Sequence, residues 1–135
     1  RDVVLPALGE GKVVLADRFD MSTFAYQGYG RGLDLEQVRQ ANRMATGGLV
    51  PDLCLVLDVP VSLGLDRKGG PEGGDRIERE GSGFLTRVGQ GYRSLVEQMT
   101  SARLVPATGT EEEVQAALQG ALREAFPETF SSGGV

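Results

Sequence analysis

The sequence has no histidine, no tryptophan, one cysteine, and no hydrophobic run long enough to cross a membrane. Without histidine, or a nucleophile paired with a base, acyl transfer and most acid–base chemistry lose their usual residues. Phosphoryl transfer depends on positioning and charge neutralisation, so it remains open. Cys54 lies in an apolar stretch and is interpreted as a buried thiol, which favours a reducing cytoplasm.

Basic residues are the minority, because 14 Lys and Arg stand against 19 Asp and Glu for a net charge of −5. This balance argues against a nucleic-acid-binding surface, and nothing in the sequence predicts membrane insertion. Any phosphate site must therefore be a local cluster of basic side chains on an acidic protein. Candidates for this cluster are Arg18, Arg67, Lys68 and Arg76.

A phosphate-loop motif is also absent, since the 135 residues contain no G-x-x-x-x-G-K-[ST]. That loop cradles the phosphates of ATP in P-loop proteins and supplies a lysine and a magnesium-binding hydroxyl.

Apolar runs and helical patterns alternate along the chain, which predicts an α/β fold. Asp34-x-x-Gln37 and Thr110-x-x-Glu113 are candidate capping boxes at the starts of two helices. Strands are expected at 12–17, 53–59 and 104–107, and helices at 1–9, 34–46, 83–99 and from 110, with a short helix after Pro60.

Asp17 and Arg18 end the first predicted strand, where open α/β sheets bind ligands. The planar fork of an arginine can hold a phosphate through two charge-assisted hydrogen bonds. The alternative is an ordinary surface ion pair. Asp58, which ends the second strand, is interpreted as a helix cap, with a secondary role beside magnesium as the alternative.

A helix over Ser22–Gln27 would place Thr23 and Tyr26 or Gln27 on one face, in front of Arg18. The glycine pattern after it, Gly28-x-Gly30-x-Gly32, is interpreted as a flexible turn because it lacks the phosphate-loop lysine. Arg31 is interpreted as a structural bridge or as a residue at a dimer contact.

The sixteen residues from 17 to 32 resemble the signature of bacterial thymidylate kinases. They read Asp17-Arg18-Phe19-x-x-Ser22-Thr23-x-Ala25-Tyr26-Gln27-Gly28-x-Gly30-Arg31-Gly32. Downstream, Pro51-Asp52-Leu53-x-Leu55-x-Leu57-Asp58-Val59 is similar to the next core strand of that family, and Asp75-Arg76-Ile77-Glu78 is similar to its lid.

The resemblance implies a parallel sheet flanked by helices, as in P-loop nucleoside monophosphate kinases, with its amino-terminal strands missing. The chain would then be the carboxyl-terminal two-thirds of such an enzyme. We expect one partial domain over 1–125, a lid at about 67–83, and a disordered tail over 126–135.

The same resemblance assigns roles to residues around Arg18, which would bind the phosphate of dTMP. Thr23 and Gln27 would approach the thymine, Tyr26 would pack against the deoxyribose, and Asp17 would support Arg18 and the metal region.

A second group would act on ATP, which enters with Mg²⁺. Arg76, with Arg67 and Lys68, would close over the ATP phosphates, and Asp75 and Glu78 would order the lid. No residue of the chain is assigned as a metal ligand.

We therefore expect a cytoplasmic enzyme that transfers the γ-phosphoryl group of ATP to dTMP in its full-length form, with the 135-residue chain itself inactive. One alternative is a non-catalytic nucleotide-binding or assembly fragment. Another is a related P-loop kinase acting on a different nucleoside or nucleotide. A homodimer is also left open.

Overall fold

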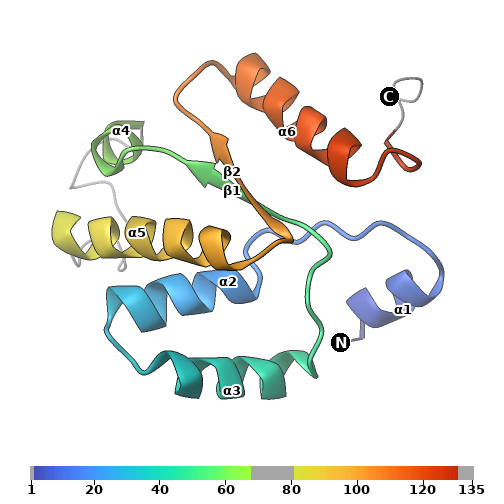
Figure 1. Cartoon of the computed structure of the whole chain (residues 1–135), viewed down its shortest axis with the longest axis horizontal. Coiled ribbons are helices and arrows are strands. Elements are labelled where there is room, and N and C mark those ends of the chain that lie inside the picture. The colour runs from blue at the N-terminus through green and yellow to red at the C-terminus, as the bar shows by residue number, and fades with distance from the viewer. Residues whose placement is uncertain (1, 68–80, 131–135) are drawn as a thin grey trace.

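The computed structural model describes residues 2–67 and 81–130 (Figure 1). Helices and strands alternate from the middle of the chain onward, as the sequence predicts. The elements are α1 Val4–Gly9, α2 Asp20–Thr23, the π-helix η1 Phe24–Gly30, α3 Leu35–Thr46, β1 Cys54–Asp58, α4 Val61–Arg67, α5 Ser82–Gln98, β2 Ala102–Pro106 and α6 Glu111–Ala125.

Two strands form the sheet, and they run parallel, with Cys54 opposite Ala102 and Asp58 opposite Pro106. Both strands are rich in apolar residues because helices cover the sheet on both sides. Figure 1 shows α5 on one side of the strands and α6 on the other. The predicted parallel sheet flanked by helices is therefore confirmed.

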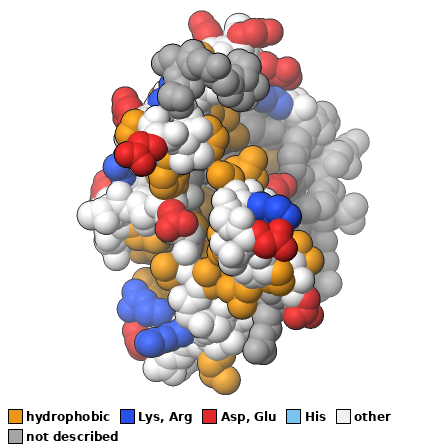
Figure 2. Space-filling view, turned by 90° about the vertical axis from the view of Figure 1, so that its right-hand side faces the viewer, with side chains coloured by type: hydrophobic (Ala, Val, Ile, Leu, Met, Phe, Trp, Pro, Cys, Tyr) orange, Lys and Arg blue, Asp and Glu red, His pale blue; other side chains and the backbone are white. Residues whose placement is uncertain are grey.

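The strand expected at 12–17 does not form; these residues run as an extended segment without strand pairing. A strand is stable only when a neighbour accepts and donates its backbone hydrogen bonds, and neither of the two described strands pairs with this segment. Val13 and Leu15 are consequently 58% and 85% exposed, and Leu57 on β1 is 52% exposed. Hydrophobic side chains also lie open on the face shown in Figure 2.

Of the two predicted capping boxes, Asp34 supplies its N-cap bond and Thr110 forms the full box. The side chain of Asp34 accepts a hydrogen bond from the backbone N–H of Gln37 at 2.9 Å, and α3 ends at Gly47 in the left-handed conformation, with φ 66°. At α6, Thr110 and Glu113 exchange both hydrogen bonds of a capping box. Local side-chain chemistry thus fixes where these two helices begin.

The core centres on contacts between η1 and α5, where Ala25, Phe84 and Val88 are buried. Gly28 and Gly30 belong to η1 and are buried too, so the prediction of a flexible turn at this pair is wrong. A Cβ on Gly30 would lie 2.6 Å from Phe84 Cε2 and 2.9 Å from Val88 Cγ2. Glycine is therefore needed here because two helices approach closely.

The structure describes the predicted lid and the predicted tail only in part. Most of the predicted lid lies outside the described residues, apart from the end of α4 and the start of α5. Residues 126–130 form turns, in which the rings of Phe126 and Phe130 are 6.3 Å apart, and residues 131–135 lie outside the described part of the chain. None of the described helices is long and apolar enough to cross a membrane.

Candidate functional site

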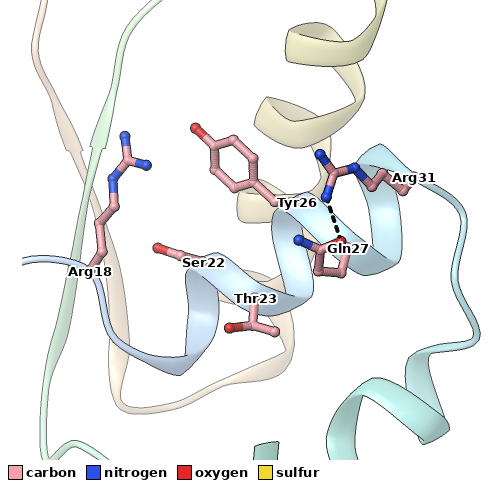
Figure 3. A pocket seen from close by; sticks show the side chains of 6 residues that line it. All are labelled: Arg18, Ser22, Thr23, Tyr26, Gln27 and Arg31. Carbon is pink, nitrogen blue, oxygen red and sulfur yellow. Dashed lines mark hydrogen bonds between the residues drawn. The ribbon is translucent and has the colours of Figure 1, made fainter. Parts of the chain in front are cut away.

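A pocket of about 200 Å³ opens between the end of the extended segment and the α2–η1 helix. Figure 3 shows the side chains around it, which come from one continuous stretch of sequence. The lining residues are Arg18, Ser22, Thr23, Tyr26, Gln27 and Arg31. Four residues that the sequence assigned to substrate binding, Arg18, Thr23, Tyr26 and Gln27, thus lie around one cavity.

Arg18 has an unusual backbone for an arginine, because its φ is 57°, in the left-handed region. It is the one non-glycine residue with a positive φ among those described. A side chain with a Cβ is strained there by about 1–2 kcal/mol, and such strain is concentrated at functional sites. This conformation turns the exposed guanidinium toward the pocket, with Cζ 5.5 Å from the centroid of the Tyr26 ring.

Tyr26 is held on its other side by aromatic residues of α5. Its ring meets Phe84 edge-on, with centroids 6.0 Å apart, and Tyr92 edge-on at 6.5 Å. The Tyr92 hydroxyl in turn donates to Ser22 Oγ at 2.9 Å. Burial raises the pKa of the Tyr92 phenol, and its hydrogen bond with Ser22 partly offsets that effect. Tyr92 therefore stays neutral and fixes the wall behind Tyr26.

Gln27 and Arg31 form the far end of the pocket. Arg31 Nη1 donates to Gln27 Oε1 at 2.9 Å, and Arg31 Cζ lies 6.0 Å from the centroid of Phe84. The sequence assigned neither Arg31 nor Ser22 to substrate binding. Their spacing was a usable signal, since Ser22 lies four residues before Tyr26 and Arg31 lies four residues after Gln27.

Asp17 is exposed and does not line the pocket. No group of three or more His, Cys, Asp and Glu among the described residues is arranged to hold a metal ion. The described part of the site therefore offers guanidinium, hydroxyl and amide groups, and the support of the metal region by Asp17 stays a prediction.

Arg67 lies at the end of α4, where its guanidinium donates to the carbonyl oxygen of Ala107 at 2.9 Å and to that of Gly109 at 3.5 Å. These bonds tie α4 to the loop after β2, and Arg67 is not part of the pocket around Arg18. Its role toward ATP stays a prediction. The other residues of that group, Lys68, Asp75, Arg76 and Glu78, lie outside the described residues.

Asp58 pairs with a residue far along the chain instead of capping a helix. Its carboxylate accepts from Arg93 Nη2 at 2.8 Å and Nε at 3.3 Å, so the arginine of α5 binds both oxygens. The prediction of a cap is wrong because the partner, Arg93, is 35 residues away, where local spacing does not reveal it.

The parallel strands and the helices on both sides of them place the chain among α/β proteins. A family model described as thymidylate kinase matches residues 1–118. The chain therefore belongs to the thymidylate kinase family.

Curated relatives share its sequence at 42–54% identity. A thymidylate kinase of Synechococcus sp. (strain JA-2-3B'a(2-13)) is 47% identical over 127 residues, covering 93% of this chain and 60% of the relative. The one of Desulforudis audaxviator is 53% identical over 94 residues, covering 70% and 42%. The one of Finegoldia magna is 42% identical over 113 residues, covering 84% and 56%. The chain thus spans about half the length of the curated relatives it matches.

Proposed function

We propose that the pocket binds dTMP, and that the complete gene product transfers the γ-phosphoryl group of ATP to it, giving dTDP and ADP. The observation that carries this proposal is that Arg18, Thr23, Tyr26 and Gln27 line the same cavity. The name shared by the relatives supports the choice of thymidylate as the acceptor.

Each group in the pocket suits a part of that acceptor. A phosphate monoester is largely a dianion at neutral pH, because its second pKa is near 6, so it needs positioning and not deprotonation. The Arg18 fork binds it through two hydrogen bonds. Tyr26 packs against the deoxyribose, where its ring leaves no room for a 2′-hydroxyl, and Thr23 and Gln27 hydrogen-bond to the base.

The donor side of the reaction is assigned from the family resemblance. Arg76, Arg67 and Lys68 bind the phosphates of ATP, and Asp75 and Glu78 order the lid over them. Mg²⁺ enters with ATP and neutralises phosphate charge when bound. We place the enzyme in the cytoplasm, and dimer formation stays open.

The 135-residue chain alone is expected not to turn over, because a G-x-x-x-x-G-K-[ST] loop is absent from it. The amides, lysine and hydroxyl of that loop supply much of the positioning in kinases of this type. Binding of dTMP without turnover is therefore the activity proposed for the isolated chain.

A coupled assay of ADP formation tests the proposal on the complete gene product, with dTMP, dCMP, dGMP and AMP as acceptors. We expect dTMP to give the highest kcat/KM. Arg18→Ala should lower it at least about a hundredfold, because a charge-assisted bidentate contact is lost. Arg18→Lys should also be poor, because an ammonium lacks the fork.

Arg39→Met is the matched control, since Arg39 lies on α3 and pairs with the exposed Glu36. It should leave kcat/KM unchanged. If Arg18→Ala kept near-normal kcat/KM for dTMP, or if another acceptor were preferred, the assignment would be wrong. ADP formation by the 135-residue chain would contradict the second part of the proposal.

A further inference from the structure

Arg31 lines the pocket although no substrate role was assigned to it. Its Nη1 donates to Gln27 Oε1 at 2.9 Å, as the dashed line in Figure 3 shows. The guanidinium also lies over Phe84, a residue only 3% exposed, with Cζ 6.0 Å from the ring centroid. Arg31 is therefore held between the Gln27 amide and the aromatic core.

An arginine next to an amide decides which way that amide faces. The guanidinium has five N–H donors and no acceptor, so the atom of Gln27 beside it must be the oxygen. The amide NH₂ group is then turned to the opposite side, and Figure 3 shows the nitrogen of Gln27 pointing away from Arg31 into the pocket. The part of the Gln27 amide turned into the pocket is thus its pair of hydrogen-bond donors.

The backbone keeps Arg31 in this place. Its N–H donates to the carbonyl oxygen of Tyr26 at 3.1 Å, a π-helical bond that spans five residues. The neighbouring carbonyl of Gly30 accepts from Arg87 Nε at 3.1 Å. The end of η1 is therefore anchored to α5, and the Arg31 side chain starts from a fixed point.

We propose that Arg31 is a positioning residue that sets base specificity by fixing the amide of Gln27. This inference rests on the proposed function. With its NH₂ group facing the ligand, Gln27 selects a pyrimidine that presents a carbonyl at the position where cytosine carries its exocyclic amino group, as thymine does. It disfavours cytosine, whose exocyclic amino group is itself a donor and would leave two donors facing each other.

Without Arg31 the amide can rotate about its last side-chain torsion and present its oxygen instead. The oxygen would accept from the cytosine amino group, so the discrimination should fall. A site built to hydrogen-bond one partner loses much of its selectivity when its polar groups can rearrange.

The test measures kcat/KM of the complete gene product for dTMP and for dCMP, in the wild type and in Arg31→Met, Arg31→Lys and Arg39→Met. Methionine keeps an unbranched stem against Phe84 but removes the donor. Lysine keeps a donor that can reach Gln27 Oε1. Arg39 is the control, because it pairs with the exposed Glu36 on α3 and does not line the pocket.

In Arg31→Met we expect the dTMP to dCMP ratio of kcat/KM to fall about tenfold, through a higher KM for dTMP with little change in kcat. Arg31→Lys should restore most of the ratio, and Arg39→Met should leave it unchanged. In Gln27→Ala, adding Arg31→Met should cause no further loss, because the residue that Arg31 positions is gone.

Two failures are distinguishable. A wild type that does not use dTMP overturns the proposed function and this inference with it. A wild type that prefers dTMP, with Arg31→Met lowering activity toward both nucleotides equally and no rescue by lysine, overturns the inference alone and leaves Arg31 with a purely structural role.

Discussion

The guanidinium of Arg18 lies over the ring of Tyr26, with Cζ 5.5 Å from the ring centroid. The residue proposed to bind the phosphate is thus positioned by the residue proposed to bind the sugar. Tyr26 is itself held by Phe84 and Tyr92 of α5. A helix with no residue in the pocket lining therefore determines where the acceptor phosphate would lie.

The strained backbone of Arg18 predicts that glycine at this position stabilises the fold while dTMP binding is lost. Arg18→Gly should be more stable than Arg18→Ala by about 1 kcal/mol, because glycine adopts a positive φ without a Cβ clash. Both variants should lose dTMP binding equally. Urea unfolding and calorimetric titration with dTMP measure the two effects. Equal stabilities of the glycine and alanine variants would show that the left-handed conformation of Arg18 costs nothing.

Alanine substitutions at two glycines of α5 distinguish the effect of close packing from that of helix propensity. A Cβ on Gly91 would lie 2.6 Å from Tyr29 Cβ, whereas a Cβ on Gly89 would have nothing within 4 Å. Gly91→Ala should therefore destabilise the chain by about 1–3 kcal/mol through overpacking. Gly89→Ala should stabilise it by about 1 kcal/mol, because alanine favours a helix. The free energy of unfolding of each variant is the measurement, and a stabilising Gly91→Ala would contradict the close contact with Tyr29.

The surroundings of Asp20 predict that a neutral residue at this position makes the fold more stable, by an amount that depends on pH. Its Oδ1 is buried with no hydrogen-bond partner among the described residues, and burial raises the pKa of its carboxyl above 3.8, partly offset by backbone hydrogen bonds. The folded state therefore binds a proton more tightly than the unfolded state, and the charged form destabilises the fold above that raised pKa. Asp20→Asn should be more stable than the wild type at pH 7, by about 1 kcal/mol for a partly buried unsatisfied group.

This advantage should shrink as the pH falls through the raised pKa and vanish below 3.8, where Asp20 is neutral in both states. Urea unfolding of both proteins across this range is the measurement. Asp20 also contributes to the raised pKa of the Cys54 thiol, after burial, so the variant should react faster with a thiol reagent at pH 8. A stability difference independent of pH would show that the Asp20 charge is not the cause.

Arg76 is predicted to act mainly in the transition state. In the complete gene product, Arg76→Ala should raise the activation free energy of the chemical step by up to about 3 kcal/mol and so lower kcat, with a smaller effect on the KM for dTMP. The reason is that a lid arginine would neutralise charge developing on the transferred group. Arg79→Ala, three residues along, serves as the control. An increase in KM alone would assign Arg76 to ground-state binding.

Local chemistry was enough to predict the starts of α3 and α6 and four of the six residues that line the pocket. The hydrogen bonds at Asp34 and Thr110 connect residues only three apart, so sequence spacing reveals them. The pocket residues also lie within one short stretch, 18–31, where helical periodicity brings them onto one face. Their roles toward dTMP stay predictions.

Features that depend on distant partners were not predictable in the same way. The apolar run at 12–17 has the composition of a strand, but pairing requires a neighbour that the run itself does not specify. The position of Asp58 after a strand favours a cap, whereas its partner, Arg93, is 35 residues away. The glycines of η1 suggest a turn because the demand for small residues comes from Phe84 and Val88 on another helix.

The π-helix η1 makes the pocket tolerant of one change in the length of the chain. A π-helical turn holds about one residue more than an α-helical turn, so Phe24–Gly30 behaves as an α-helix with an inserted residue that the wider turn absorbs. If that residue were lost, the segment could relax to an α-helix with Gln27 and Arg31 still on the face of Ser22 and Thr23. A single-codon deletion in η1 would therefore leave the proposed base contact and the proposed phosphate contact on the same side of the helix.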